Sequence, residues 1–410
     1  MWYDLVEQQR HWLRMWRESA RLALSVWPAV TLPHAAARYY DDLFAPLLNP
    51  AAAPPPFALG PLMLDGRQHA IAEAVVADAP FCALRRFWRD DRPPAPRAIL
   101  LCVPLSGHAA VMMRETVAAL LEDGDVYVTD WLNARDVPLA AGRFGLDDYV
   151  RMLERFLDTL LADARPVHVI AVCQATYPTL GALALRASDG AVPPVSVAMI
   201  GGPLDARRNP SMLGRAAESL SLEWCRRHLI DVVPAGFAGH GRDVFPTYLQ
   251  QVEITAVYPL RYLSLIDSYA DATSHHDSDA LADARRALRD YTALLDMPAE
   301  YFLDTIDLVF QRACLANRTW RVEGEAVRPD ALRDTALITI EARLDAVTGA
   351  GQTHAAHELC AGIDDTKRCH LDVEACDHYG LFTGAHWCAE VHPVLQAAFG
   401  AAERGMHLSA

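Results

Sequence analysis

The feature that most constrains the fold is a regular alternation of short apolar runs with helical patterns, which begins after Pro96. The apolar runs are RAILLCVPL, DVYVTDW, RPVHVIAVC and VSVAMIGG, and each has the length of a strand. Helical patterns lie between them, at 112–121, 147–161 and 176–187. Apolar strands that alternate with helices are typical of right-handed βαβ units, whose parallel sheet is covered on both faces. We therefore expect an α/β fold with a doubly wound, mostly parallel sheet.

The alternation stops near Asp205 and resumes only at TALITIEAR, residues 335–343. The segment KRCHLDVE (367–374) predicts one more strand, and a last helix is expected over 389–399. Between these two stretches, residues 205–333 carry helical patterns, aromatic residues and turn breakers, without a convincing buried strand. The sequence therefore predicts a core in two parts, 57–204 and 334–410, interrupted by a helical lid over 205–333. At the start of the core, AEAVVADAPFCALRRFWRD predicts edge strands.

Residues 1–56 are expected to form an N-terminal helical extension and a linker. The first 27 residues place apolar side chains at roughly helical spacing: Trp2, Leu5, Val6, Trp12, Leu13, Trp16, Ala20 and Leu24. We favour a helix that packs on its own domain over a surface that binds a partner or a hydrophobic body. The proline-rich segment NPAAAPPP (49–56) predicts the linker.

Charge and composition exclude several classes of function. The 410-residue chain has a formal net charge of -15, which argues against nucleic acid or an anionic membrane surface as the main partner. No run of about 18 apolar residues predicts a membrane span, and the charged N-terminus does not resemble a signal peptide. Nine scattered cysteines, an odd number, suit free thiols in a reducing cytoplasm better than a disulfide framework.

The stretch AVCQA, residues 171–175, has the features of a nucleophile elbow. A tight turn between a strand and a helix requires small residues two before and two after the nucleophile, and here Ala171 and Ala175 flank Cys173. The helix N-terminus would favour the thiolate of that cysteine. Local context alone favours a buried packing cysteine, so the assignment depends on the rest of the chain.

Two later loops supply the missing acid and base. Asp345 follows the strand predicted at 335–343, and His378 follows the strand predicted at 367–374. Nucleophile, acid and base in this chain order, at the ends of these strands, are typical of an α/β-hydrolase triad. We therefore expect His378 to take the thiol proton from Cys173, and Asp345 to orient the imidazole.

Oxyanion stabilisation needs two N–H groups directed at the developing charge. Gln174 follows the nucleophile and is expected to supply one; the N–H of Leu105 or Ser106, in the loop VPLSGHAA, is expected to supply the other. Ser106 is also a rival nucleophile, although its flanks lack the elbow pattern. His108 in the same loop is either a substrate contact or a packed histidine.

A zinc site is the metal hypothesis that the sequence raises. The candidate ligands are His354, His357, Cys360, Cys369, Cys376 and His378. Their spacing lacks the paired C-x₂-C or H-x₃₋₅-H pattern of structural zinc, and ligands at i, i+3 and i+6 diverge around a helix. We expect no metal and no other cofactor.

Segments spread along the chain resemble the intracellular polyhydroxybutyrate depolymerases of bacteria. They are VPLSGHAAVMMRETVAALL, DVYVTDWLNARDVPL, VHVIAVCQAT, MIGGPLDAR, VPAGFAGHGRDVFP, AEYFLDTI and GAGQTHAAHELCAGI. The resemblance covers nearly the whole chain, and its motifs are long. It implies a cytoplasmic α/β-hydrolase that acts on the amorphous polyester of storage granules through a cysteine nucleophile.

Carried over motif by motif, the resemblance implies the same triad of Cys173, Asp345 and His378. Two departures matter, because the family pattern has proline at the position of Ala175 and glycine at that of Asp377. Asp377 could raise the basicity of His378 or compete with Asp345. For the lid, the candidate substrate contacts are Trp224, Phe237, Phe245 and Tyr248, although lid packing explains any single one of them more readily.

Two other functions stay open. The same triad occurs in polyhydroxyalkanoate synthases, which are acyltransferases on the same scaffold. A second possibility is a non-catalytic granule-binding protein that uses the tryptophan-rich N-terminal helix. A homodimer is plausible from the same aromatic helix.

Overall fold

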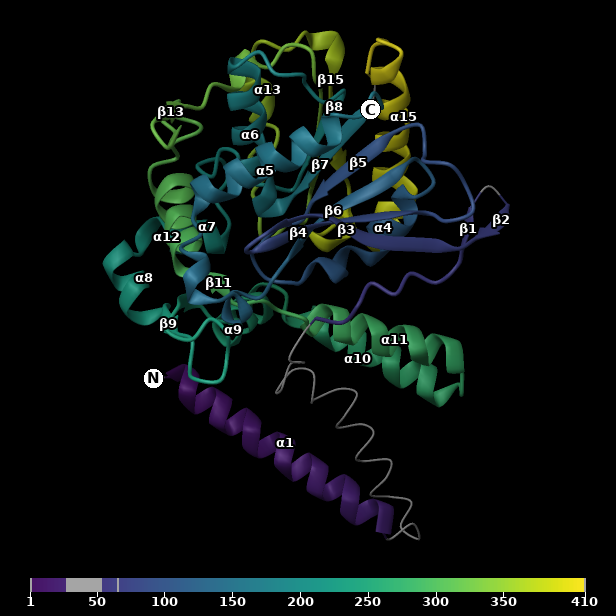
Figure 1. Ribbon diagram of the computed structural model, residues 1–410, viewed down its shortest axis with the longest axis vertical. Helices are drawn as coiled ribbons and strands as arrows, with labels where there is room; N and C mark the ends of the chain where they lie inside the picture. The colour runs from purple at the N-terminus through teal and green to yellow at the C-terminus, as the bar shows by residue number, and fades with distance from the viewer. Residues whose placement is uncertain (1, 27–53, 65, 409–410) are drawn as a thin grey trace.

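A single eight-stranded sheet forms the centre of the computed structural model, which describes residues 2–26, 54–64 and 66–408 (Figure 1). Its strands, in spatial order, are β3 Ile71–Ala79, β4 Cys82–Arg89, β6 Asp125–Trp131, β5 Ala98–Cys102, β7 Val167–Val172, β8 Ser196–Ile200, β14 Ala336–Ala342 and β15 Arg368–Val373. Strand β4 is antiparallel to both of its neighbours, and the pairs from β6 to β15 are parallel. The expected mostly parallel α/β sheet is therefore confirmed.

Helices cover both faces of this sheet. Helices α5 Leu146–Leu161 and α6 Thr176–Ser188 pack together on one face, while α4 Arg114–Leu120 and α15 His392–Glu403 lie on the other (Figure 1). Every residue of β5, β7, β8 and β14 is buried. A strand that is covered on both faces cannot alternate between apolar and polar residues, which explains the continuous apolar runs of the sequence.

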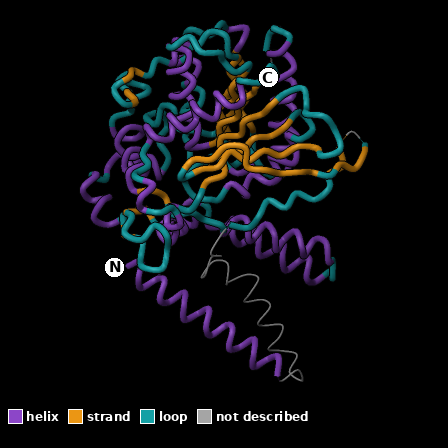
Figure 2. The backbone as a smooth tube through the Cα atoms, in the orientation of Figure 1, coloured by secondary structure: helices purple, strands orange, loops and turns teal. Residues whose placement is uncertain are grey.

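Most of the remaining elements lie in the insertion between β8 and β14. Its helices are α7 Met212–Ser219, α8 Leu222–His228, α9 Thr247–Val257, α10 Pro259–Ser274, α11 Ser278–Thr292 and α12 Ala299–Asp304. After β14 come α13 Ala356–Leu359 and α14 Gly384–His386, and two short strands, β1 Leu62–Leu64 and β2 Arg67–His69, precede β3. Helices and strands are distinguished in Figure 2.

The insertion also contains short strands that the sequence analysis did not predict. Strands β9 Asp231–Val232, β10 Asp243–Phe245 and β11 Met297–Pro298 form a small sheet, and β12 Arg321–Val322 pairs with β13 Glu325–Ala326. These pairings are two or three residues long. A run this short carries no periodicity, so the hydrophobic pattern could not reveal it.

Helix α1 Trp2–Val26 confirms the predicted helix, and its N-terminal part contacts the domain (Figure 1). Tyr3 is fully buried and Arg10 is 5% exposed, whereas Trp2, Trp12 and Trp16 are 66–70% exposed. The helix is therefore anchored near its N-terminal end, and most of the surface of these three tryptophans is exposed. Residues 49–53 of the predicted linker lie outside the described residues.

Candidate active site

Cys173 lies at a sharp turn between β7 and α6. Its φ is +52°, in the left-handed region, and a 3₁₀ turn over Cys173–Ala175 leads into the helix. Non-glycine residues rarely hold this conformation, and they cluster at functional turns. Ala171 and Ala175 are fully buried. Gly202 lies so close that a Cβ there would collide with Thr176 Oγ1 and with the Cys173 carbonyl oxygen, so small residues are required around this elbow.

The loops after β14 and β15 bring the predicted acid and base together. His378 Nδ1 lies 2.7 Å from Asp345 Oδ2, and both side chains are almost completely buried. Asp345 Oδ1 accepts hydrogen bonds from the backbone N–H groups of Val347 and Thr348, at 2.7 and 2.9 Å. The carboxylate is thus held in place while its other oxygen orients the imidazole.

The imidazole of His378 also faces the sulfur of Cys173. Burial disfavours the imidazolium, but the Asp345 carboxylate and a hydrogen bond with Cys173 outweigh it and raise the pKa of His378 well above its ordinary value. The hydrogen bond with Cys173 places the imidazole where it can exchange a proton with the sulfur, as nucleophilic cysteine catalysis requires.

Asp377, the alternative partner considered for His378, makes other contacts. Its Oδ1 accepts the N–H of Gly380 at 2.9 Å, and its Oδ2 lies 3.9 Å from Arg261. The side chain therefore caps the turn after His378, and Asp345 makes the contact with the imidazole.

The oxyanion loop, residues 103–110, is the loop predicted to supply an oxyanion N–H. The side chain of Gln174 joins it to the turn at Cys173. Gln174 Oε1 accepts the N–H of Ser106 at 3.1 Å. The N–H of Leu105 has no hydrogen-bond partner among the described residues. Of the two loop candidates, Leu105 therefore keeps its N–H available for an incoming oxyanion.

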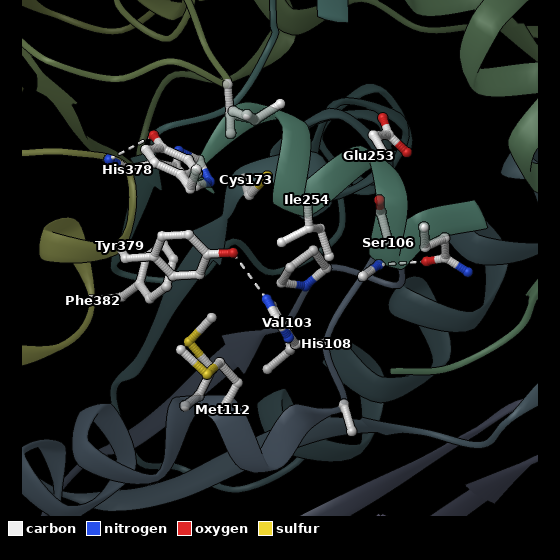
Figure 3. Close-up of a pocket in the computed structure, with 18 of the residues that line it drawn as sticks. Val103, Ser106, His108, Met112, Cys173, Glu253, Ile254, His378, Tyr379 and Phe382 are labelled. Carbon is white, nitrogen blue, oxygen red and sulfur yellow. Dashed lines mark hydrogen bonds between the residues drawn. The ribbon is translucent and has the colours of Figure 1, made fainter. Parts of the chain in front are cut away.

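A cavity of about 110 Å³ opens over Cys173 and His378 (Figure 3). Its walls are mainly apolar and come from three parts of the chain. Val103, Pro104, Ala109, Met112 and Met113 belong to the first part of the core; Leu213, Ile254, Val257 and Tyr258 belong to the insertion; Val347, Tyr379 and Phe382 belong to the last part. Such a site suits an uncharged, hydrocarbon-rich ligand.

His108 lies on the cavity wall as a packed residue with one hydrogen bond. Its Nε2 lies 2.9 Å from Tyr379 Oη (Figure 3), and its ring centroid lies 4.9 Å from that of Tyr291. Burial lowers the pKa of His108 to about 4, so it is neutral at pH 7. Among the described residues, His108 makes no hydrogen bond with Ser106, so this histidine does not activate that hydroxyl.

The aromatic residues predicted to contact substrate lie away from this cavity. Phe245 stacks on Phe302, with ring centroids 4.2 Å apart, and Trp224 stacks on His228. Phe237 and Tyr248 pack edge-on against Tyr3, so they hold helix α1. Each of these aromatics packs within the insertion or against the N-terminal helix, which explains why the four residues do not reach the cavity.

Two site residues from the insertion escaped the sequence analysis. Tyr258 Oη accepts the backbone N–H groups of Ala346 and His378, at 3.1 and 3.3 Å, and so ties the acid loop to the histidine loop. Glu253 lines the cavity without a hydrogen-bond partner among the described residues, and burial raises its pKa to about 7. Neither residue lies in a motif, so no sequence signal distinguished them from helix surface.

The thiols fall into two groups. All nine cysteines are free; Cys388 is exposed, Cys173 is partly exposed, and the other seven are buried. Burial raises the pKa of several of the latter, and that of Cys102 reaches about 12.

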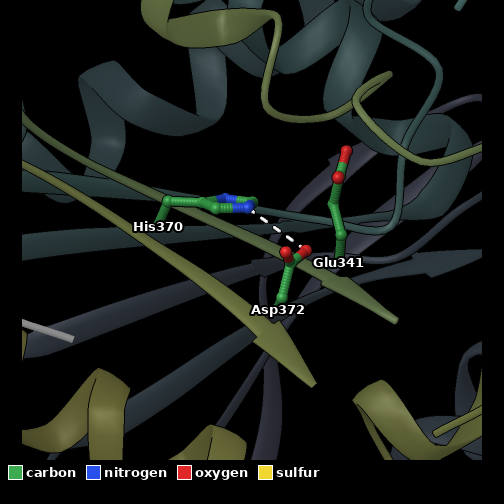
Figure 4. Close-up of side chains that lie close together, drawn as sticks. All are labelled: Glu341, His370 and Asp372. Carbon is green, nitrogen blue, oxygen red and sulfur yellow. Dashed lines mark hydrogen bonds and ion pairs between the residues drawn. The ribbon is translucent and has the colours of Figure 1, made fainter. Parts of the chain in front are cut away.

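A second polar cluster lies on β14 and β15 (Figure 4). Donor atoms of Glu341, His370 and Asp372 lie within 4.8 Å of one another, which suits a divalent cation in principle. However, the Glu341 carboxylate already accepts the N–H groups of Gly351, Thr353 and His354. His354, from the predicted zinc motif, stacks on His357 with centroids 4.5 Å apart.

The strand order, the left-handed cysteine after β7, and the acid and base loops after β14 and β15 define an α/β hydrolase. Residues 201–402 match the model of the family described as PHB de-polymerase C-terminus. This match covers just under half of the chain, and the residues that it covers include Asp345 and His378.

Similar solved structures include an α/β hydrolase fold protein from Nakamurella multipartita, with 13% identity and a TM-score of 0.43 over 82% of this chain and 100% of that one. The esterase LipW from Mycobacterium marinum gives 14% identity and a TM-score of 0.42, over 82% of each chain. Carboxyl esterase 2 from the fungus Tuber melanosporum gives 10% identity and a TM-score of 0.43, over 82% of this chain and 87% of that one. No curated protein matches the chain. No helix in the described part of the chain has the length and apolar character needed to cross a membrane.

Proposed function

We propose that the protein hydrolyses the backbone esters of poly(3-hydroxybutyrate) through an acyl-cysteine intermediate. The observation that carries the proposal is the line from Asp345 through His378 to Cys173, at an elbow beneath a small apolar cavity. The family match over residues 201–402 supports the choice of polyester.

In the first half of the reaction, the Cys173 thiolate attacks the ester carbonyl carbon. The carbonyl oxygen becomes an oxyanion, which the N–H groups of Gln174 and Leu105 stabilise. The tetrahedral intermediate then collapses, keeping the new carbon–sulfur bond and breaking the ester carbon–oxygen bond. His378 gives its proton to the departing alkoxide, and the alcohol end of the polymer leaves.

In the second half, neutral His378 removes a proton from water as the oxygen attacks the thioester carbonyl. The new tetrahedral intermediate collapses with loss of the Cys173 thiolate. A carboxylic acid leaves, and the enzyme returns to its starting thiolate–imidazolium pair.

The proposal extends to the surroundings of the site. Residues 205–333 act as the lid, because α9 forms one wall of the cavity. The partner is the amorphous polyester granule of the cytoplasm, and the exposed tryptophans of α1 suit an apolar surface.

Product analysis by mass spectrometry on amorphous polymer tests the reaction. Wild type is expected to release 3-hydroxybutyrate or its oligomers, and Cys173→Ala is expected to release none. Cys173→Ser is the matched variant that keeps a hydroxyl nucleophile. Parallel reactions with and without CoA show whether water or CoA accepts the acyl group.

Two experimental results would contradict the proposal, and each would favour a different function. Polymer formation with CoA release from hydroxybutyryl-CoA would make the protein a synthase-like acyltransferase. If wild type releases no product while Cys173→Ala binds granules normally, the protein is a granule-binding protein that acts through α1.

A further inference from the structure

A second apolar pocket, of about 220 Å³, lies beside the active-site cavity. It is formed by α9, α10 and the turn after α11, and its walls include Thr255, Tyr262, Leu263, Tyr291 and Leu294. Leu263 is 52% exposed, so the pocket has a mouth at the protein surface. None of the sites described so far uses this pocket.

The two pockets share a thin wall made of His108 and Ile254, which line both of them. The loop that carries His108 is fixed from the outer side, because the Ala109 N–H donates to Ala293 at 2.7 Å and the Leu295 N–H donates to Gly107 at 3.2 Å. The outer pocket is thus built against the back of the oxyanion loop. A ligand in it would lie one side chain away from the cavity above Cys173.

The chemistry of the second pocket is that of a hydrocarbon site. The Thr255 hydroxyl donates to Gln251 within α9, and the Thr292 hydroxyl donates to Leu288 within α11, each at 2.8 Å. These hydroxyls are satisfied by their own helices, and apart from Gln251 the remaining walls are mainly aliphatic and aromatic. Of the described residues, none that lines the pocket carries a charge at pH 7, so it would not recognise an ionised ligand.

The active-site cavity is too small for an extended substrate. Its volume is about 110 Å³, whereas pockets that enclose a drug-sized ligand measure about 300–1,000 Å³. A polymer extends beyond the scissile ester, so adjoining residues of the chain need another surface. The second pocket adjoins the cavity at the His108–Ile254 wall and offers an apolar surface of this kind.

We propose that the pocket at Leu263, Tyr291 and Leu294 is a subsite for an apolar ester chain, which binds the part of the substrate that extends past the His108–Ile254 wall. This inference rests on the proposed function for its natural ligand, a flexible polyester. It assigns the protein a preference for long chains over short esters, which the triad alone does not provide.

The test compares two substitutions one turn apart on α10. Leu263→Trp fills the mouth of the pocket, while Leu260→Trp is the matched control, because Leu260 is 73% exposed and lines neither pocket. The readout is the ratio of kcat/KM for a linear 3-hydroxybutyrate tetramer to kcat/KM for p-nitrophenyl butyrate. We expect Leu263→Trp to lower this ratio about tenfold, equivalent to the loss of one well-buried apolar contact. Leu260→Trp should leave it at the wild-type value.

A second pair on α9 repeats the test from the opposite wall. Thr255→Phe should lower the ratio, and Val252→Phe, at a 66% exposed position outside both pockets, should not. Equal ratios in all four variants and wild type would overturn the subsite.

A series of p-nitrophenyl alkanoates separates this inference from the proposed function. If wild type cleaves no 3-hydroxybutyrate oligomer, the polyester assignment fails, and the alkanoates then decide the subsite alone. A fall in the ratio of long to short alkanoates in Leu263→Trp, but not in Leu260→Trp, supports the subsite. An unchanged ratio refutes it.

Discussion

The 2.7 Å contact between Asp345 Oδ2 and His378 Nδ1 determines both the orientation and the charge of the imidazole. The charge of the neighbouring carboxylate raises the pKa of His378 well above its ordinary value despite burial, which favours the imidazolium. In Asp345→Asn the amide no longer stabilises that charge. We expect kcat to fall roughly 10³–10⁴-fold and the alkaline limb of the kcat/KM profile to move to lower pH.

The same shift predicts how the substitution affects folding. A raised folded-state pKa contributes stability that is fully present below the ordinary histidine pKa of about 6.5. That stability is lost as the pH rises through the folded-state value. Urea unfolding of Asp345→Asn should therefore show a larger deficit at pH 6 than at pH 9, with Asp377→Asn as the control. An alkaline limb that stays in place would contradict the role of Asp345.

Tyr258 is a positioning residue, because it acts through the acid and histidine loops. Tyr258→Phe removes the acceptor of two N–H groups, and a buried donor without a partner costs about 1–3 kcal/mol. We expect kcat to fall about tenfold, with a smaller change in KM, because the loops of Ala346 and His378 are no longer tied together. Tyr248→Phe, on α9 and away from the cavity, is the matched control, because it also removes a hydrogen-bonded tyrosine hydroxyl. Equal losses in kcat and in unfolding free energy for both variants would reduce Tyr258 to a packing residue.

The candidate site was predictable where strand ends define it. Cys173, Asp345 and His378 each follow a strand that the sequence predicts, and parallel strands bring their carboxyl ends to one edge of the sheet. Tyr258 and Glu253 were not predictable, because they lie in the helical insertion, whose orientation depends on tertiary packing. The aromatics Phe245 and Trp224 were selected by residue type, and type alone does not say which face of an element meets the cavity.

Among the elements, the elbow between β7 and α6 depends on a neighbour from another strand. Gly202, just after β8, faces Thr176 and the Cys173 carbonyl with no room for a Cβ. In Gly202→Ala this turn has to shift, and a displacement of the nucleophile by about 1 Å can cost about 100-fold in rate. We expect kcat/KM to fall by at least that factor. Gly60→Ala serves as the control and should keep wild-type activity, because a Cβ added at Gly60 would meet open space.

Element boundaries show why sequence patterns worked in the core and failed elsewhere. Strand β6 occupies the predicted run DVYVTDW from end to end, because its mostly buried residues make a clear apolar signal. Strand β11 has two residues and exists only because β10 lies beside it. Its pairing is a tertiary contact, so the local hydrophobic pattern cannot predict it.

At the scale of the whole molecule, helix α1 is joined to the body through Tyr3. The Tyr3 hydroxyl donates to the buried Asp296 carboxylate, whose other oxygen accepts the Thr247 N–H at 2.7 Å. Tyr3→Phe leaves one carboxylate oxygen without this donor, at an expected cost of about 1–3 kcal/mol in unfolding free energy. Trp12→Phe, at a 70% exposed position, should change stability by less than about 0.5 kcal/mol. Thermal unfolding of the two variants provides the comparison, and equal midpoints would show that α1 is not anchored here.

The burial of most cysteines allows thiol labelling to report on the folded state of the protein. Seven cysteines are shielded by the core, so only Cys173 and Cys388 are open to an alkylating reagent. A Cys388→Ser variant would carry one accessible sulfur per chain. Folded molecules of this variant should take up one label per chain, and any uptake above one would report molecules whose core has opened and exposed the seven buried thiols.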